Sequence, residues 1–165
     1  MEYVDIYNEH KELTGERLPR NTKLPQGKYM QYVLALIRCQ DHYLITRRTM
    51  DKKWAAGAWE VPGGGCMAGE SSLEAVIREV MEETGLDITG HNQMIYSYRN
   101  EDLDHGDNYF MDIYLCSLDF SLADVTIEED EVLDAKLATI DEISDLYNKD
   151  GFLHYKRILE ALQIR

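Results

Sequence analysis

The chain contains two kinds of segment, short apolar runs and longer stretches in which apolar residues recur every three or four positions. Short runs rich in Val, Ile, Leu and Tyr are typical of strands, and the longer spacing is typical of helices with one buried face. The run 32–39 predicts a buried strand, which a polar turn joins to the next strand as a hairpin. We expect strands at 32–39, 43–46, 59–61, 94–99, 109–118 and 132–138, and helices at 71–84, 141–148 and 152–162.

The helix at 71–84 has the clearest start and stop signals. Ser71, followed three residues later by Glu74, is typical of a capping box, and Gly85 is a good helix terminator. The spacing predicts a core-facing stripe made of Leu73, Val76, Ile77, Val80, Met81 and Thr84.

Strands and helices are mixed along the chain, which favours a layered α/β or α+β fold. A length of 165 residues fits one domain, so we expect a single domain over 1–165. Residues 1–28 are rich in polar and turn-forming residues, with Pro19 and Pro25 among them. We interpret 1–28 as an amino-terminal extension that is packed on the domain and contains a short strand near 3–7.

Composition narrows the possible partners. The net charge of −14 disfavours a general binder of nucleic acid or of anionic membranes, because both would be repelled by the average surface field. The three cysteines are scattered and form no CxxC pair, no apolar run approaches the length of a membrane span, and the first residues lack a secretory signal. We therefore expect a reduced, cytoplasmic protein without a membrane partner.

Two local features suggest chemistry. The strand at 59–61 ends at Pro62 and opens into Gly63, Gly64 and Gly65. Consecutive glycines permit positive φ angles and a close approach of the backbone to a ligand, although a flexible turn explains the glycines alone.

The second feature is on the helix, where Glu79, Glu82 and Glu83 occupy positions i, i+3 and i+4. This spacing places three carboxylates on one helical face, where they repel one another. A solvated acidic face explains the pattern in so acidic a chain. The alternative is a site for a hard divalent cation, which prefers oxygen ligands and neutralises the crowding.

The two features belong to one longer pattern. Gly64 is followed after five residues by Glu70 and after seven more by the run 78–86, Arg-Glu-Val-Met-Glu-Glu-Thr-Gly-Leu. Over residues 64–86 the chain resembles the Nudix box at every specified position, and the flanking segments resemble that superfamily too. The resemblance implies a Nudix-type α/β/α sandwich around a mixed sheet. It also implies hydrolysis of a small nucleoside-diphosphate-linked or related diphosphate compound.

The resemblance further implies a cofactor, Mg²⁺ or Mn²⁺. By matching positions, its ligands would be the side chains of Glu79, Glu82 and Glu83 together with the carbonyl of Gly63. Structural roles in the motif fall to Gly64, Glu70, Arg78 and Gly85. Arg78 can orient the acidic cluster by ion pairing, because it lies four residues from both Glu74 and Glu82. Glu70 can pair with Arg78 or bond the glycine loop.

The general base is left open by the motif. The candidates are Glu79 or Glu82 within the box, and Glu129 or Glu131 in the acidic run 128–131, which a solvated loop explains equally well. Metal ions in such a site activate water for attack at phosphorus.

Substrate contacts are suggested by Arg47 and Arg48, because arginine binds phosphate through paired hydrogen bonds. Strand alternation allows only one of the two to face the site. Tyr96, Tyr98 and Tyr109 could stack on a base, but aromatic residues on strands more often serve packing.

Two alternative functions remain. Asp5-Ile6-Tyr7, Thr14-Gly15 and the run 18–20 resemble the leader of the isopentenyl-diphosphate-isomerase-like branch. True isomerases of that type need a cysteine and a histidine between the tryptophan strand and the Gly-Glu-Ser at 69–71. Here that stretch has no histidine, and Cys66 lies beyond the expected position, so the isomerase is disfavoured. The other alternative is a non-catalytic, ligand-sensing Nudix module. The sequence identifies no substrate, and the extension and the late helices are candidates for a homodimer interface.

Overall fold

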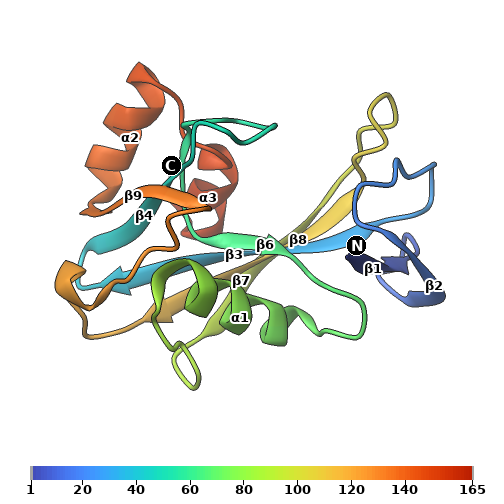
Figure 1. Cartoon of the computed structure of the whole chain (residues 1–165), viewed down its shortest axis with the longest axis horizontal. Coiled ribbons are helices and arrows are strands. Elements are labelled where there is room, and N and C mark those ends of the chain that lie inside the picture. The colour runs from blue at the N-terminus through green and yellow to red at the C-terminus, as the bar shows by residue number, and fades with distance from the viewer. Residues whose placement is uncertain (1, 165) are drawn as a thin grey trace.

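The computed structural model describes residues 2–164. The predicted strands and helices are all present in the expected order, together with two strands that were not predicted, β2 and β6. In Figure 1, strands β3 and β8 cross the centre of the molecule, and helices lie on both sides of them. The strands are β1 (Tyr3–Tyr7), β2 (Leu13–Pro19), β3 (Met30–Cys39), β4 (His42–Arg48), β5 (Trp59–Glu60), β6 (Gly63–Gly65), β7 (Gln93–Asn100), β8 (Tyr109–Ser117) and β9 (Val132–Ala138). The helices are α1 (Ser72–Thr84), the 3₁₀ turn η1 (Leu122–Asp124), α2 (Ile140–Lys149) and α3 (Tyr155–Ala161).

The central sheet is mixed, as expected. Its path runs β5-β4-β3-β8-β7, with β6 paired to β3 and β9 paired to β4. The β3–β8 pair is parallel and the other pairs are antiparallel. Together with the helices on its two faces, this sheet confirms the predicted α/β/α sandwich around a mixed sheet.

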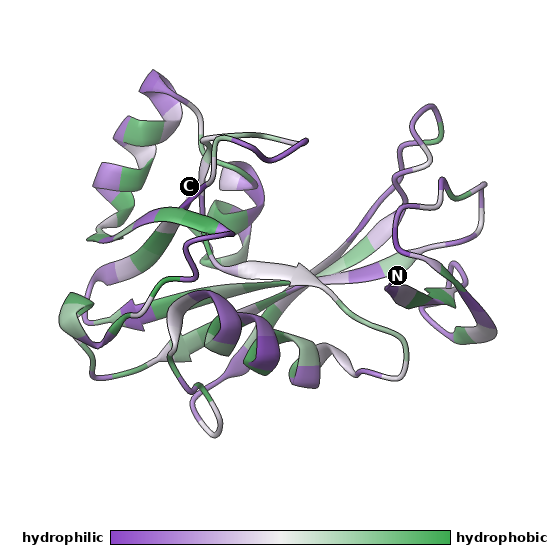
Figure 2. Ribbon diagram, in the orientation of Figure 1, coloured by the Kyte–Doolittle hydropathy of each residue, from purple (hydrophilic) through white to green (hydrophobic). Residues whose placement is uncertain are grey.

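Alternation along β3 explains why helices cover both faces of the sheet. Val33, Ala35 and Ile37 pack with α1, whereas Leu34 and Leu36 pack with α2 and α3 on the opposite face. Full burial of one such side chain stabilises the fold by about 1.5–3 kcal/mol. Because β3 contributes such side chains to both faces, it connects the two halves of the core. In Figure 2 the central strands carry much of the hydrophobic colour, while α1 carries long hydrophilic stretches.

Helix α1 begins and ends as the sequence predicts, but its buried stripe is narrower. Ser71 caps it through a complete capping box, and Gly85 ends it in the left-handed conformation. The predicted core positions Leu73 and Met81 are wrong, because their side chains are 43% and 44% exposed. The residues that α1 buries are Ala75, Val76, Val80 and Thr84.

Two further expectations need correction. The three glycines form strand β6, antiparallel to β3, so they are neither a flexible turn nor a set of positive-φ positions. The last helix begins at Tyr155 instead of 152, because His154 adopts a left-handed conformation with φ 60°.

The amino-terminal residues contain the expected strand β1 and a second strand, β2, which the sequence analysis missed. The two strands form a separate antiparallel sheet. Its apolar side chains Val4 and Ile6 are buried against Leu24 and Met30, which docks this amino-terminal hairpin on the start of β3. Among residues 2–164, no helix has the length and apolar character needed to cross a membrane.

Candidate active site

A cleft of about 920 Å³ lies beside the glycine strand β6. Its walls come from the amino-terminal hairpin, β3, the loop after β4, β6, α1 and the acidic loop before β9. It brings together residues that are far apart in the sequence, including Gly63, Gly64, Glu79, Glu82 and Glu83. Two of the three consecutive glycines and all three glutamates of the acidic face therefore line one cavity.

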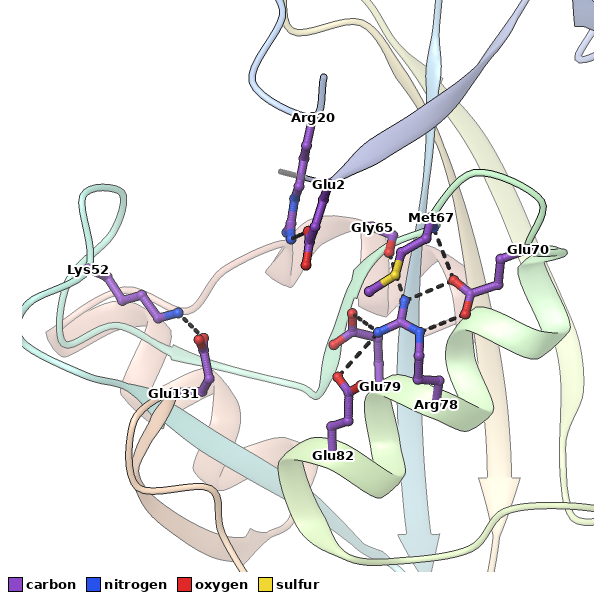
Figure 3. A network of polar contacts seen from close by, with 10 residues as sticks. All are labelled: Glu2, Arg20, Lys52, Gly65, Met67, Glu70, Arg78, Glu79, Glu82 and Glu131. Carbon is purple, nitrogen blue, oxygen red and sulfur yellow. Dashed lines mark hydrogen bonds and ion pairs between the residues drawn. The ribbon is translucent and has the colours of Figure 1, made fainter. Parts of the chain in front are cut away.

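Arg78 organises the acidic side of this cleft, as Figure 3 shows. Its Nε and Nη2 donate to the two carboxylate oxygens of Glu70 at 2.6 and 2.8 Å, and Nη2 also donates to the carbonyl of Gly65 at 3.1 Å. Its Nη1 donates to Glu79 at 2.9 Å and to Glu82 at 3.2 Å. Arg78 therefore ties the loop before α1, strand β6 and the acidic face together.

The pairing of Arg78 differs in one respect from the expected one. Glu82 is a partner, but Glu74 is engaged in the capping box. Glu70 also accepts a hydrogen bond from the Met67 N–H at 3.0 Å. Burial raises the pKa of the Glu70 carboxyl, but the hydrogen bonds from Arg78 and Met67 outweigh it and lower the pKa below its ordinary value. Glu70 is thus held as a carboxylate beside Arg78.

Glu79 and Glu83 form a crowded acidic pair at the base of the cleft. Burial raises the pKa of Glu83 well above its ordinary value, and the negative charges of Glu79 and Glu60 raise it further. The Gly63 N–H donates to Glu83 at 3.4 Å and opposes this shift only in part. Burial also raises the pKa of Glu79, although Arg78 opposes it. The positive charge near these two carboxylates is therefore too small to balance both of them when they are ionised.

Gly63 and Gly64 are required by the close approach of their neighbours. A Cβ at Gly64 would lie 2.5 Å from the carboxyl carbon of Glu79. A Cβ at Gly63 would overlap the backbone carbonyl of Val33 on β3. The absence of these two side chains lets α1 place Glu79 directly on the backbone of β6.

The donor set of the acidic face suits a hard divalent cation. The box glutamates and the Gly63 carbonyl offer oxygen atoms only, and the crowding of Glu60, Glu79 and Glu83 is the kind that a cation relieves. Among residues 2–164, no group of three or more His, Cys, Asp or Glu side chains is already arranged around a common point. Glu79 and Glu82 both accept a hydrogen bond from Nη1 of Arg78.

The other predicted site residues are divided between the cleft and its surroundings. Arg48 lines the cleft and pairs with Glu60 at 3.3 Å, whereas Arg47 donates to the Gly57 carbonyl at 2.9 Å. Glu131 lines the cleft and pairs with Lys52, which lines it too (Figure 3). Glu129 does not line the cleft.

The tyrosines that were considered for stacking serve packing to a large extent. Tyr96, Tyr98 and Tyr109 belong to the core on the α2 and α3 face, and only Tyr109 of the three also lines the cleft.

Several residues of the cleft wall were not predicted from the sequence. The loop after β4 contributes Lys52, Lys53 and Trp54, and the amino-terminal hairpin contributes Glu2 and Arg20. Trp54 is 59% exposed, with the Arg48 guanidinium 5.2 Å from its ring centroid. The cationic pair Lys52-Lys53 beside a tryptophan was a signal that could have marked the loop. No local signal marks Arg20, because its position depends on how the hairpin docks.

Comparison with known proteins identifies the family. A NUDIX domain family model matches residues 28–162. An uncharacterized Nudix hydrolase of Listeria monocytogenes, lmo0368, is 31% identical over 159 residues, which cover 94% of this chain and 90% of the relative.

Solved structures share the fold. DR0079 from Deinococcus radiodurans aligns with a TM-score of 0.78 at 20% identity, over 97% of this chain and 99% of that chain. A bifunctional NMN adenylyltransferase/ADP ribose pyrophosphatase from Francisella tularensis, complexed with AMP and a Mn ion, aligns with a TM-score of 0.69 at 24% identity. That alignment covers 82% of this chain and 41% of the other. The family model and the Listeria relative both span most of the sequence, and the chain therefore belongs to the NUDIX domain family and is a Nudix hydrolase.

Proposed function

We propose that the chain hydrolyses a pyrophosphate bond in a small nucleoside-diphosphate-linked or related diphosphate compound, with Mg²⁺ or Mn²⁺ as cofactor. The observation that carries this proposal is the close contact of the glycine strand with the partly buried Glu79 and Glu83, all of which line one cleft. The Francisella protein, part of which shares this fold, is complexed with AMP and a Mn ion, which supports the class of ligand and cofactor.

The residues divide into binding and positioning roles in this proposal. Glu79, Glu82, Glu83 and the Gly63 carbonyl would hold the cation, which lowers the pKa of water and neutralises charge on the diphosphate. Arg78 and Glu70 position the acidic face through their paired hydrogen bonds. Arg48, at the end of β4, lines the cleft and binds a phosphate of the substrate. Arg47 supports the loop after β4 through its hydrogen bond to the Gly57 carbonyl.

The proton from the attacking water must be accepted by a carboxylate at the cleft. Glu79 and Glu82 remain candidates on α1. Of the two loop candidates, Glu131 is favoured over Glu129, because Glu131 lines the cleft and Glu129 does not. The ion pair between Lys52 and Glu131 must break before Glu131 can act as a base.

We also propose that residues 1–165 form a single Nudix domain, with 1–28 as its extension. The buried contacts of Val4 and Ile6 with Met30 support this division, because they leave the amino-terminal hairpin no core of its own. The partner is a small diphosphate compound, and the cleft's size fits that class, since ligand pockets typically measure about 300–1,000 Å³.

The test replaces the proposed ligands without removing volume. Glu82→Gln and Glu83→Gln should each lose most turnover with Mg²⁺, because each deletes ligand charge, while circular dichroism and the melting temperature show an intact fold. Glu9→Gln is the matched control, since Glu9 has a side chain that is 58% exposed and lies outside the cleft. Full activity in both ligand variants would contradict the proposal.

The substrate panel separates this proposal from its alternatives. It contains nucleoside-diphosphate sugars, dinucleotides, nucleoside triphosphates and isopentenyl diphosphate, each assayed with Mg²⁺. Cleavage of an anhydride bond supports the hydrolase. Double-bond migration in isopentenyl diphosphate without phosphate release would support the isomerase, and binding without any turnover would support a ligand-sensing module.

A further inference from the structure

The amino-terminal hairpin forms one wall of the cleft. The hairpin residues that line the cleft are Glu2, Arg20 and Asn21, which lie far ahead of the box in the sequence. The hairpin is fixed to the loop that leads into α1. The Gly69 N–H donates to Asp5 at 2.7 Å, and the Ala68 N–H donates to the carbonyl of Tyr3 at 2.9 Å. The wall therefore keeps a defined position relative to the acidic face.

Most cations of the cleft are engaged by the protein itself. Arg78 has five hydrogen bonds to Glu70, Glu79, Glu82 and Gly65. Arg48 pairs with Glu60 and also donates to the Trp54 carbonyl at 3.1 Å. Arg78 therefore has little capacity left for a second anion, and Arg48 can bind a phosphate only by leaving the partly buried Glu60.

Arg20 is different. Among residues 2–164, its ion pair is with Glu2 at 2.9 Å, and the side chains of the two residues are 44% and 49% exposed. An exposed pair of this kind contributes about 0–1 kcal/mol. An anionic group on a ligand can therefore displace Glu2 from Arg20 at small cost.

The position of Arg20 relative to β6 separates it from the acidic face. Adjacent residues of a strand face opposite sides, and the glycines of β6 follow this rule. A Cβ at Gly64 would meet Glu79, whereas a Cβ at Gly65 would lie 3.4 Å from the Tyr32 ring and 3.9 Å from Nε of Arg20. Burial raises the pKa of Tyr32, and the nearby charge of Arg20 opposes that shift. Figure 3 shows the Glu2–Arg20 pair apart from the Arg78 cluster and from the Lys52–Glu131 pair.

We propose that Arg20 binds an anionic substituent of the substrate that lies outside the scissile diphosphate, and that the amino-terminal hairpin thereby selects substrates carrying such a group. This inference rests on the proposed function, which places the scissile diphosphate at Glu79 and Glu83. The substituent is a phosphate or a carboxylate. With a net charge of −14, the chain repels anionic ligands on average, so a cation with an exposed, replaceable partner has a large effect on selection.

The test compares substrates that differ only in this substituent. UDP-glucuronate against UDP-glucose adds a carboxylate, and NADPH against NADH adds a phosphate, while the diphosphate is unchanged in each pair. The variants are Arg20→Gln, Arg20→Lys and the control Arg17→Gln. Arg17 lies on the same hairpin, pairs with Asp5, and does not line the cleft.

The wild-type chain should prefer the anion-bearing member of at least one pair by about fivefold to tenfold in kcat/KM, as expected for a charge-assisted hydrogen bond at a partly exposed site. Arg20→Gln should abolish this preference by raising KM for the anion-bearing member, with the neutral member changed less than about twofold. Arg20→Lys should keep part of the preference, and Arg17→Gln should keep all of it. The pair that shows the preference identifies the anion as carboxylate or phosphate.

An absent preference in the wild-type chain, or an equal loss on both members in Arg20→Gln, overturns the inference. If the enzyme hydrolyses another panel member instead, the same four compounds are measured as competitive inhibitors, and the ratio of their inhibition constants is the readout. If no panel member is hydrolysed, the proposed function fails. Calorimetric binding of the four compounds then still shows whether Arg20 discriminates by charge.

Discussion

The three consecutive glycines of β6 allow a matched set of alanine substitutions with three different outcomes. At Gly64 the added Cβ would meet the Glu79 carboxyl group at 2.5 Å, so a functional side chain must move. At Gly63 it would overlap the Val33 carbonyl, so the β3–β6 pairing itself must move. At Gly65 the nearest atom is 3.4 Å away on the Tyr32 ring, which is ordinary contact.

The sizes of the effects follow from what must move. Overpacking against backbone typically costs about 1–3 kcal/mol, and in a domain of this size each kcal/mol lowers the melting temperature by about 3 °C. We therefore expect Gly63→Ala to lower the melting temperature by about 3–9 °C. Gly64→Ala should lower it less, because the Glu79 side chain can rotate away, but it should reduce kcat with Mg²⁺ by at least about tenfold.

Thermal unfolding and steady-state turnover of the three variants, measured side by side, check this order. Gly65→Ala serves as the control and should stay close to the wild-type chain in both measurements. The reasoning is refuted if Gly64→Ala keeps full kcat, or if Gly63→Ala is as stable as Gly65→Ala. The first result would mean that the close approach of α1 to β6 is not needed, and the second that the β3–β6 pair tolerates an added side chain at Gly63.

Three further changes test the polar contacts. Arg78→Lys cannot maintain both hydrogen bonds to Glu70, so unfolding in urea should show a loss of about 1–2 kcal/mol together with reduced turnover. The Asp112 side chain is 3% exposed and pairs with Lys11 at 2.6 Å. Lys11→Met removes this cation and should lower the free energy of unfolding by about 2 kcal/mol, whereas Lys11→Arg should keep most of the stability. Burial lowers the pKa of His154 below its ordinary 6.5, so the unfolded chain binds the proton first and stability falls as pH drops below about 6.5. Asparagine tolerates the left-handed backbone at this position and does not titrate, so His154→Asn removes this effect. Between about pH 7 and pH 5, urea unfolding of the variant should therefore show a smaller loss of stability than that of the wild-type chain.

Local signals in the sequence were sufficient for the elements that carry the box. Ser71 with Glu74 and the glycine at 85 define the two ends of α1, and the nearly continuous apolar run of 32–39 defines a strand buried on both faces. The resemblance over 64–86 added the superfamily and the mixed-sheet sandwich. Spacing alone could not show that Leu73 and Met81 lie outside the contact between α1 and the sheet.

Contacts between distant segments could not be predicted. Strand β2 is polar and mostly exposed, and it is specified by its pairing with β1 instead of by an apolar pattern of its own. The glycines were read as a turn, because nothing local shows that β3 passes beside them. Arg20 joins the cleft only through the docking of the hairpin on the loop before α1.

The central claim is that the acidic face of α1 and strand β6 together bind a divalent cation. Crystals soaked in Mn²⁺ and measured for anomalous scattering test it most directly. The account predicts one or more peaks within coordination distance of oxygen atoms from Glu79, Glu82 or Glu83 and of the Gly63 carbonyl, with Glu82 turned away from Arg78. An anomalous map without a peak there, at a Mn²⁺ concentration that supports turnover in solution, would contradict the account.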